Sequence, residues 1–218
     1  MEKPRKIGVF DSGVGGESVA KAIKKQLPEH DIIYVSDNKN VPYGSKTQAE
    51  LKKLVMPIMQ TLSRHVDVIV IACNTVSTLL VKEIRQEIST PIIALEPMVK
   101  PAAEQTKSGV VAVCATPATL GSERYQWLKQ AYAKGVEVLE PDCSIWSQMI
   151  EANSVQKEHI HQQITNVCEK DADVIVLGCT HYHWIENIIN EEAAGRAVVL
   201  QPEQPAIKQL NRVLAQLD

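Results

Sequence analysis

Eight short runs of apolar, mostly β-branched residues recur along the chain, and segments with helical spacing separate them. The runs are residues 6–10, 31–35, 67–72, 91–95, 110–114, 136–140, 173–178 and 197–201. Between the first two runs, Val19, Ile23 and Leu27 fall on one face of a helix. Strands that alternate with helices predict βαβ units and a mostly parallel sheet. Apolar runs without strict alternation are typical of strands that are covered on both faces.

The strand runs divide into two sets of four. The first set begins with residues 6–10 and the loop DSGVGGES, and the second begins with residues 110–114 and the loop ATPATLGS. We therefore predict an α/β fold of two similar lobes, each with a mostly parallel four-stranded sheet flanked by helices. The active site is expected in the cleft between the lobes, because ligands of open α/β sheets bind outside the carboxyl ends of the strands.

The limits of the lobes follow from this division. Residues 1–96 form the first predicted lobe and residues 97–202 the second, with the proline-containing segment LEPMVKPA (95–102) crossing between them. Apolar residues at helical spacing predict a further helix over residues 203–218. We expect this helix to pack back on the first lobe.

Composition and charge exclude several classes of protein. The formal net charge of −3 argues against a nucleic-acid surface, and no apolar run approaches the ~20 residues that span a membrane. The N-terminal residues show no signal-peptide pattern. Five cysteines without a CxxC pair fit a reducing, cytoplasmic setting better than a disulfide framework.

Candidate chemistry lies at the ends of two strands. Residues 67–75 read DVIVIACNT and residues 173–181 read DVIVLGCTH, so each run leads into a cysteine and then into hydrogen-bonding side chains. If the lobes face each other, Cys73 and Cys179 lie on opposite walls of one cleft. One thiolate and one thiol on opposite sides of a carbon form an acid–base pair. On the α-carbon of an amino acid, such a pair inverts the stereocentre without a metal or another cofactor.

This chemistry needs helper groups, because charge on the substrate must be held by donors as the α-proton leaves. Asn74, Thr75 and Thr180 directly follow the cysteines, and Ser12, Thr116 and Thr119 lie on the two matching first loops. Asp11 is a candidate to hold the substrate ammonium or to tune a thiol. His181, two residues after Cys179, is the natural proton or charge partner of that cysteine.

The motifs resemble the glutamate racemases, within the cofactor-independent aspartate/glutamate racemase family. The matching segments, in family order, are IGVFDSGVGG (7–16), VPYG (41–44), ACNT (72–75), LEPMVKPA (95–102) and LGCTHY (177–182), with a weaker match at MIE (149–151). They span nearly the whole chain. The combination of DSGVGG, CNT and GCTHY is specific, whereas any one of these motifs alone is weak.

The resemblance implies interconversion of L- and D-glutamate, which supplies D-glutamate for peptidoglycan, by a homodimer without cofactor or metal. It implies Cys73 as the base for the D-substrate and Cys179 as the base for the L-substrate, with Glu151 assisting on the His181 side. The residues that it implies around the substrate are Asp11, Ser12, Tyr43, Gly44, Asn74, Thr75, Thr180 and His181. The chain departs from the family pattern at residues 37–40, 183–184 and 201–202, which leaves substrate range and regulation open.

Three alternatives stay open at this stage. The chain is a racemase of aspartate or another small amino acid, or a thiol-exchange protein that uses the two cysteines, or a racemase-like module that binds amino acids without turnover. Thiol exchange normally requires cysteines close enough to bond. Binding alone does not require a thiol on each wall of the cleft. The two-thiol acid–base interpretation is therefore the leading one.

Overall fold

The protein contains two four-stranded sheets, and every strand pair within them is parallel. This computed structural model describes residues 3–217. The first sheet has the order β2-β1-β3-β4 and the second the order β6-β5-β7-β8. The strands are β1 (Lys6–Asp11), β2 (Asp31–Ser36), β3 (Val68–Ile71), β4 (Ile92–Ala94), β5 (Val110–Ala115), β6 (Glu137–Leu139), β7 (Val174–Gly178) and β8 (Val198–Leu200). The predicted fold of two lobes, each with a parallel four-stranded sheet, is thus confirmed, and the two sheets have corresponding strand orders.

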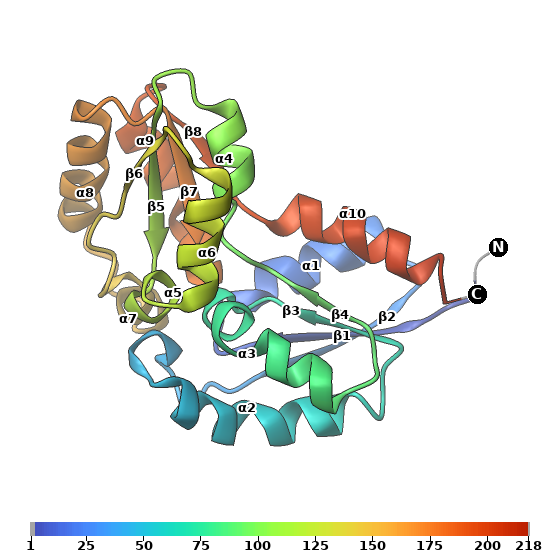
Figure 1. The fold of residues 1–218 in the computed structure, drawn as a ribbon. Helices are drawn as coiled ribbons and strands as arrows, with labels where there is room; N and C mark the ends of the chain where they lie inside the picture. The colour runs from blue at the N-terminus through green and yellow to red at the C-terminus, as the bar shows by residue number, and fades with distance from the viewer. Residues whose placement is uncertain (1–2, 218) are drawn as a thin grey trace.

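Helices cover both faces of each sheet (Figure 1). In the first lobe they are α1 (Gly16–Gln26), α2 (Gln48–Leu62), α3 (Asn74–Glu87) and α10 (Glu203–Leu214), with the short 3₁₀ helix η1 (Tyr43–Ser45). In the second they are α4 (Val99–Gln105), α5 (Pro117–Leu120), α6 (Glu123–Tyr132), α7 (Trp146–Glu151), α8 (Lys157–Glu169) and α9 (Glu186–Ala193), with the 3₁₀ helix η2 (Thr180–Ile185). Among the described residues, no helix combines the length and apolarity needed to cross a membrane.

Alternating residues of each strand enter the two separate cores of a lobe. In β3, Val68 and Val70 pack against α1 and α10, whereas Ile69 and Ile71 pack against α2 and α3. In the second lobe, Val174 and Val176 of β7 face the core of α4 and α6, while Ile175 and Leu177 face α7, α8 and α9. Burial on both faces explains why these strands read as continuous apolar runs.

The C-terminal helix α10 packs on the first lobe, although the chain reaches it from the second. Ile207, Leu210 and Leu214 join the core that α1 and the first sheet form, and Figure 1 shows α10 beside α1. The observed helix is shorter than the predicted range of 203–218. The lobe limits at residues 96 and 202 stay a prediction, and residues 1–2 and 218 of the predicted ranges lie outside the described part of the chain.

A capping box fixes the segment that leads into α2. The Thr47 hydroxyl accepts the Glu50 N–H at 3.3 Å, and Glu50 accepts the Thr47 N–H at 2.8 Å. This capping box satisfies two N–H groups at the start of the helix. It also fixes where η1 ends and so helps to place Tyr43 and Gly44 at the carboxyl edge of the first sheet.

Replacement of Leu210 by Ala should destabilise the protein. Leu210 is fully buried on α10, so its truncation should lower the free energy of unfolding by about 2–5 kcal/mol. Urea unfolding followed by circular dichroism measures the change. Lys208→Ala, on an exposed position of the same helix, should change it by less than about 0.5 kcal/mol. Equal stability of the two variants would contradict the packing of α10 on the first lobe.

Candidate active site

The central strands of both sheets end at a shared cavity between the lobes. In each sheet the chain leaves the first strand toward one edge and later returns to form the third strand on its other side, and such switch points bind ligands in α/β proteins. Ser12 follows β1 and Cys73 follows β3, whereas Thr116 follows β5 and Cys179 follows β7. The cavity is lined by Ser12, Val41, Pro42, Tyr43, Gly44, Cys73, Asn74, Thr75, Thr116, Ser147, Glu151, Cys179, Thr180 and His181.

Most residues predicted for the site line this cavity, and two do not. Asp11 is fully buried beneath it. Thr119 lies behind Thr75, with 3.3 Å between the two hydroxyl oxygens. Sequence reasoning did not single out Val41, Pro42 or Ser147 as lining residues. The position of Ser147, four residues before Glu151 and therefore on the same helix face, was the available signal.

Cys73 lies at the N-cap of α3 in an apolar and partly anionic setting. Its side chain is buried, and its Sγ donates to the Ser12 hydroxyl at 3.6 Å. Burial, reinforced by the charge of Asp11, raises the pKa of Cys73 to about 12. Cys73 is therefore a neutral thiol at neutral pH.

Cys179 lies in a different electrostatic environment, next to a buried cation. The Nδ1 atom of His181 is 3.7 Å from the Cys179 sulfur, and its Nε2 atom is 2.6 Å from Oε1 of Glu151. The same Glu151 oxygen accepts the Val14 N–H at 3.0 Å. A carboxylate, an imidazole and a thiol thus form one chain of contacts. A protonated imidazole in this position can donate to the sulfur and stabilise its thiolate.

The contacts of His181 keep its imidazole protonated. Burial acts to lower the pKa of His181, but the hydrogen bonds to Cys179 and Glu151 and the charges of Cys179 and Asp11 outweigh it and raise the pKa to about 11. The hydrogen bond from His181 holds the pKa of Glu151 below its usual value. At neutral pH the pair is an imidazolium and a carboxylate.

Asp11 joins the two lobes below the cavity. It accepts the N–H groups of Gly13 at 3.1 Å and Gly16 at 3.0 Å, and the Thr180 hydroxyl of the second lobe at 3.0 Å. Burial raises the pKa of Asp11, while the charge of His181 and these hydrogen bonds oppose the rise. Asp11 lies one hydrogen bond behind Thr180, which lines the cavity, and a ligand ammonium group bound nearby would favour its charged form.

Asn74 has unused hydrogen-bonding capacity next to Cys73. Both its amide nitrogen and its amide oxygen are buried, and neither has a partner among the described residues. Such groups are costly in a protein interior, so the side chain is poised for a polar ligand. The neighbouring hydroxyl of Thr75 instead contacts that of Thr116 across the lobe boundary at 3.0 Å.

Two glycines allow the lobes to approach closely. A Cβ atom on Gly15 would lie 2.6 Å from the backbone nitrogen of His181, and one on Gly44 would lie 2.7 Å from Cβ of Thr116. Both distances are shorter than any carbon contact that a side chain tolerates. The cavity between the lobes offers a water molecule only about 20 Å³ of space. This volume holds about one water molecule. The close approach of the lobes therefore leaves the cavity narrow.

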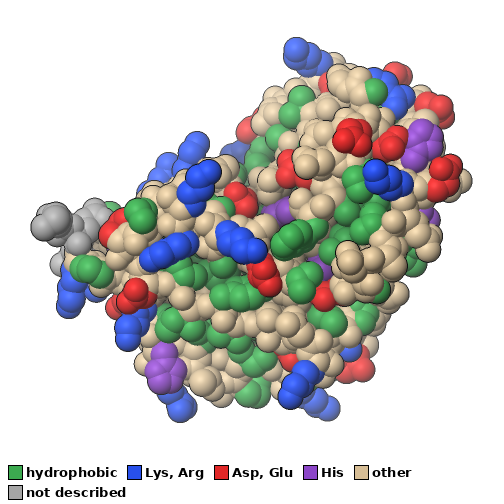
Figure 2. All heavy atoms as spheres, turned by 180° about the vertical axis from the view of Figure 1, so that it is seen from behind, with side chains coloured by type: hydrophobic (Ala, Val, Ile, Leu, Met, Phe, Trp, Pro, Cys, Tyr) green, Lys and Arg blue, Asp and Glu red, His purple; other side chains and the backbone are tan. Residues whose placement is uncertain are grey.

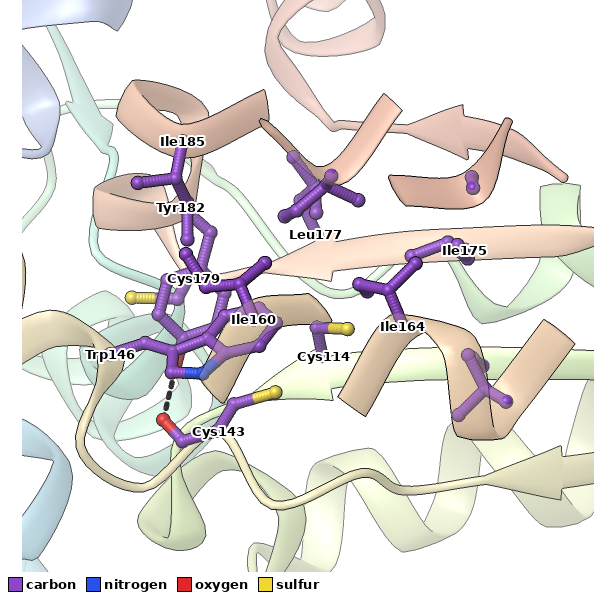
Figure 3. Close-up of a cluster of buried hydrophobic side chains, with 14 of the residues drawn as sticks. Cys114, Cys143, Trp146, Ile160, Ile164, Ile175, Leu177, Cys179, Tyr182 and Ile185 are labelled. Atoms are coloured by element: carbon purple, nitrogen blue, oxygen red, sulfur yellow. Dashed lines mark hydrogen bonds between the residues drawn. The ribbon is translucent and has the colours of Figure 1, made fainter. Parts of the chain in front are cut away.

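The remaining cysteines belong to the core rather than to the cavity. Cys114, Cys143 and Cys168 are buried and free, and they pack in the second-lobe cluster with Trp146 and Tyr182. Figure 3 shows the thiols of Cys114 and Cys143 among core side chains, whereas the Cys179 thiol points away from them. The predicted packing role of these three cysteines agrees with their positions.

The charge of His181 gives a test of this geometry by ¹⁵N NMR. Because its pKa of about 11 lies far above its usual 6.5, the ring should not titrate between about pH 5 and 9. Its contribution to stability is fully present below pH 6.5 and is lost as the pH rises through about 11. Glu151→Gln removes one stabilising partner and should move the titration to lower pH.

The spectrum of a His181→Asn variant identifies the resonance. Wild-type titration of His181 near its usual pKa would contradict the ion pair with Glu151. An unchanged titration in Glu151→Gln would show that Glu151 does not support the charge.

Comparison with known proteins gives a consistent result. Residues 7–210 match the family model described as Asp/Glu/Hydantoin racemase. The chain is 38% identical to the glutamate racemase of Herpetosiphon aurantiacus, over 99% of this chain and 87% of that protein. The crystal structure of the Francisella tularensis glutamate racemase in complex with D-glutamate superposes with a TM-score of 0.82 at 32% identity, over 97% of this chain and 81% of that one.

A second solved structure, of the glutamate racemase isoform RacE1 from Bacillus anthracis, superposes with a TM-score of 0.81 at 27% identity, over 96% of this chain and 81% of that one. Because the family model covers almost all of the described lobes, and because curated relatives align over nearly the full chain, this protein belongs to the Asp/Glu/hydantoin racemase family.

Proposed function

We propose that this protein is a glutamate racemase that moves a proton at the α-carbon between two cysteines. The observation that carries the proposal is the position of Cys73 and Cys179. They follow corresponding strands of the two sheets and line one cavity from opposite lobes. An α-carbon held between the two sulfurs would meet a base on one face and an acid on the other.

The different surroundings of the two sulfurs assign each a role in the proposed reaction. With L-glutamate bound, the Cys179 thiolate beside His181 takes the α-proton, and the C–H electron pair moves toward the α-carboxylate. The Cys73 thiol then delivers its proton to the opposite face and becomes the thiolate. Inversion is complete, and one proton has been gained and one lost by the protein. D-glutamate reacts through the same steps in reverse.

The substrate itself can ease the ionisation of Cys73. In the empty cavity the charge of Asp11 contributes to the raised pKa of this thiol. A substrate ammonium group near Asp11 would offset that charge and favour the thiolate. On the other side, the free amide of Asn74 would donate to the α-carboxylate as negative charge develops there. The Thr75 and Thr180 hydroxyls stand beside it.

The choice of glutamate as substrate rests on the relatives. They are glutamate racemases, and they align with nearly the whole chain. We propose that the D-glutamate made here enters peptidoglycan, and that the protein works in the cytoplasm. Aspartate is the alternative substrate, since the family model covers aspartate racemases as well.

Proton NMR in D₂O tests the reaction directly. Incubation with L-glutamate should remove the α-proton signal and, in parallel, the optical rotation, because the proton returned to the carbon comes from exchanged thiols. The same measurement with L-aspartate should show much slower loss. Proton exchange of aspartate but not of glutamate would contradict glutamate as the substrate. Glutamate binding without exchange would favour a non-catalytic module.

The cysteine variants separate this mechanism from other roles. Cys73→Ala and Cys179→Ala should each lower racemisation at least about 100-fold, the scale of a lost general acid or base. Cys168→Ala, a core cysteine outside the cavity, is the matched control and should keep turnover. Racemisation by either site variant at the wild-type rate would contradict the two-cysteine mechanism.

We also propose a homodimer, as the family resemblance implies. Figure 2 shows hydrophobic side chains gathered on one face of the first lobe, and an apolar groove of this lobe is lined by Ile33, Val35, Pro57, Ile58 and Leu62 along β2 and α2. Sedimentation equilibrium should give twice the chain mass of 24.1 kDa. A monomer mass across micromolar concentrations would contradict this proposal.

A further inference from the structure

Two polar side chains in the lining of the cavity have no hydrogen-bond partner within residues 3–217. One is Asn74, whose amide atoms are both unpaired. The other is Ser147, whose hydroxyl makes no hydrogen bond. The other lining hydroxyls are engaged, as in Ser12 with Cys73, Tyr43 with Asp37, Thr75 with Thr116, and Thr180 with Asp11. The cavity thus offers two unfilled polar positions.

Ser147 lies at the mouth of the cavity. It is only 7% exposed, and it sits on α7 one turn before Glu151. An outer cavity, with room for water centres in about 260 Å³, shares Pro42, Gly44, Thr116 and Ser147 with the inner one. These four residues form the boundary between the two spaces. The Ser147 hydroxyl therefore stands where a ligand would extend from the inner cavity toward the outside.

A dicarboxylic amino acid needs a second anionic contact in this place. Among residues 3–217, no lysine or arginine lines either cavity, and the cationic His181 of the lining is already bound by Glu151 and Cys179. Burial of a carboxylate without donors is strongly unfavourable. The distal carboxylate of the amino acid must therefore be held by hydroxyl and N–H groups. Among the described residues that line the inner cavity, only Ser147 has a hydroxyl without a hydrogen bond.

We propose that Ser147 is a substrate-binding residue whose hydroxyl donates a hydrogen bond to the distal carboxylate of the substrate at the cavity mouth. The inference rests on the proposed function, since it assumes a dicarboxylic amino acid with its α-carbon between the cysteines. Asn74 then holds the α-carboxylate end and Ser147 the other end. Together they set the length and charge of the amino acid that fits.

The test compares substitutions that differ in one group. Ser147→Ala removes the hydroxyl and should raise the KM of both glutamate enantiomers about tenfold or more, the value of a hydrogen bond to a charged group, with a smaller change in kcat. Ser147→Thr keeps the hydroxyl and should recover most of the affinity. Ser154→Ala, an exposed serine just after α7, is the matched control and should leave KM unchanged.

A ligand without the distal carboxylate isolates the contact. Competitive inhibition by 2-aminobutyrate should be equal in the wild-type protein and in Ser147→Ala, because this ligand has no group to meet Ser147. An unchanged KM for glutamate in Ser147→Ala, or an equal loss of affinity for glutamate and 2-aminobutyrate, would overturn the proposal.

Failure of the proposed function gives a different result. If the wild-type protein racemises no amino acid, calorimetric titration with glutamate still compares the wild-type protein with Ser147→Ala. Weaker binding by the variant would then support the contact while the racemase assignment fails. Equal binding, or no binding by either protein, would overturn the contact as well.

Discussion

The site depends on close contact between the loop after β1 and the 3₁₀ helix after β7. Asp11 accepts the Thr180 hydroxyl, Val14 donates to Glu151, and Gly15 lies directly against the backbone of His181. Each lobe alone presents a single cysteine at the edge of an open sheet. The contact turns two half-sites into one narrow cavity with room for little water, and charges and donors act strongly in such a low-dielectric space.

The two lobes have corresponding sheet topologies, but their two thiols are not equivalent. The strand orders are the same, and each cysteine follows the third strand of its lobe. Yet burial and the charge of Asp11 raise the pKa of Cys73, whereas the Cys179 sulfur lies 3.7 Å from Nδ1 of His181, a ring that can donate to it. An inversion reaction needs this difference, because one proton must be absent on one face and present on the other.

The sequence predicted the strands within about one residue at each end, since continuous apolar runs are a strong signal when both faces of a sheet are covered. It also predicted that Cys73 and Cys179 lie on opposite walls of one cavity, because ligands of α/β sheets bind outside the carboxyl ends of the strands. It could not predict that Asp11 lies beneath the cavity, because that depends on three hydrogen bonds from distant backbone and side-chain groups. Nor did it predict Ser147 as a lining residue. Ser147 lies on a short helix, and it lines the cavity only because residues of the first lobe lie opposite it.

The position of α10 has a consequence for the order in which the chain acquires its structure during synthesis. The core beneath the first sheet combines residues 7–95 with Ile207, Leu210 and Leu214, whereas the second lobe is continuous in sequence. Contacts between distant chain segments form late because loop closure costs entropy. We therefore expect the second lobe to be complete on the ribosome while one face of the first sheet is still uncovered. The face of β3 that carries Val68, Val70 and Ala72 would be covered only after α10 has left the ribosome.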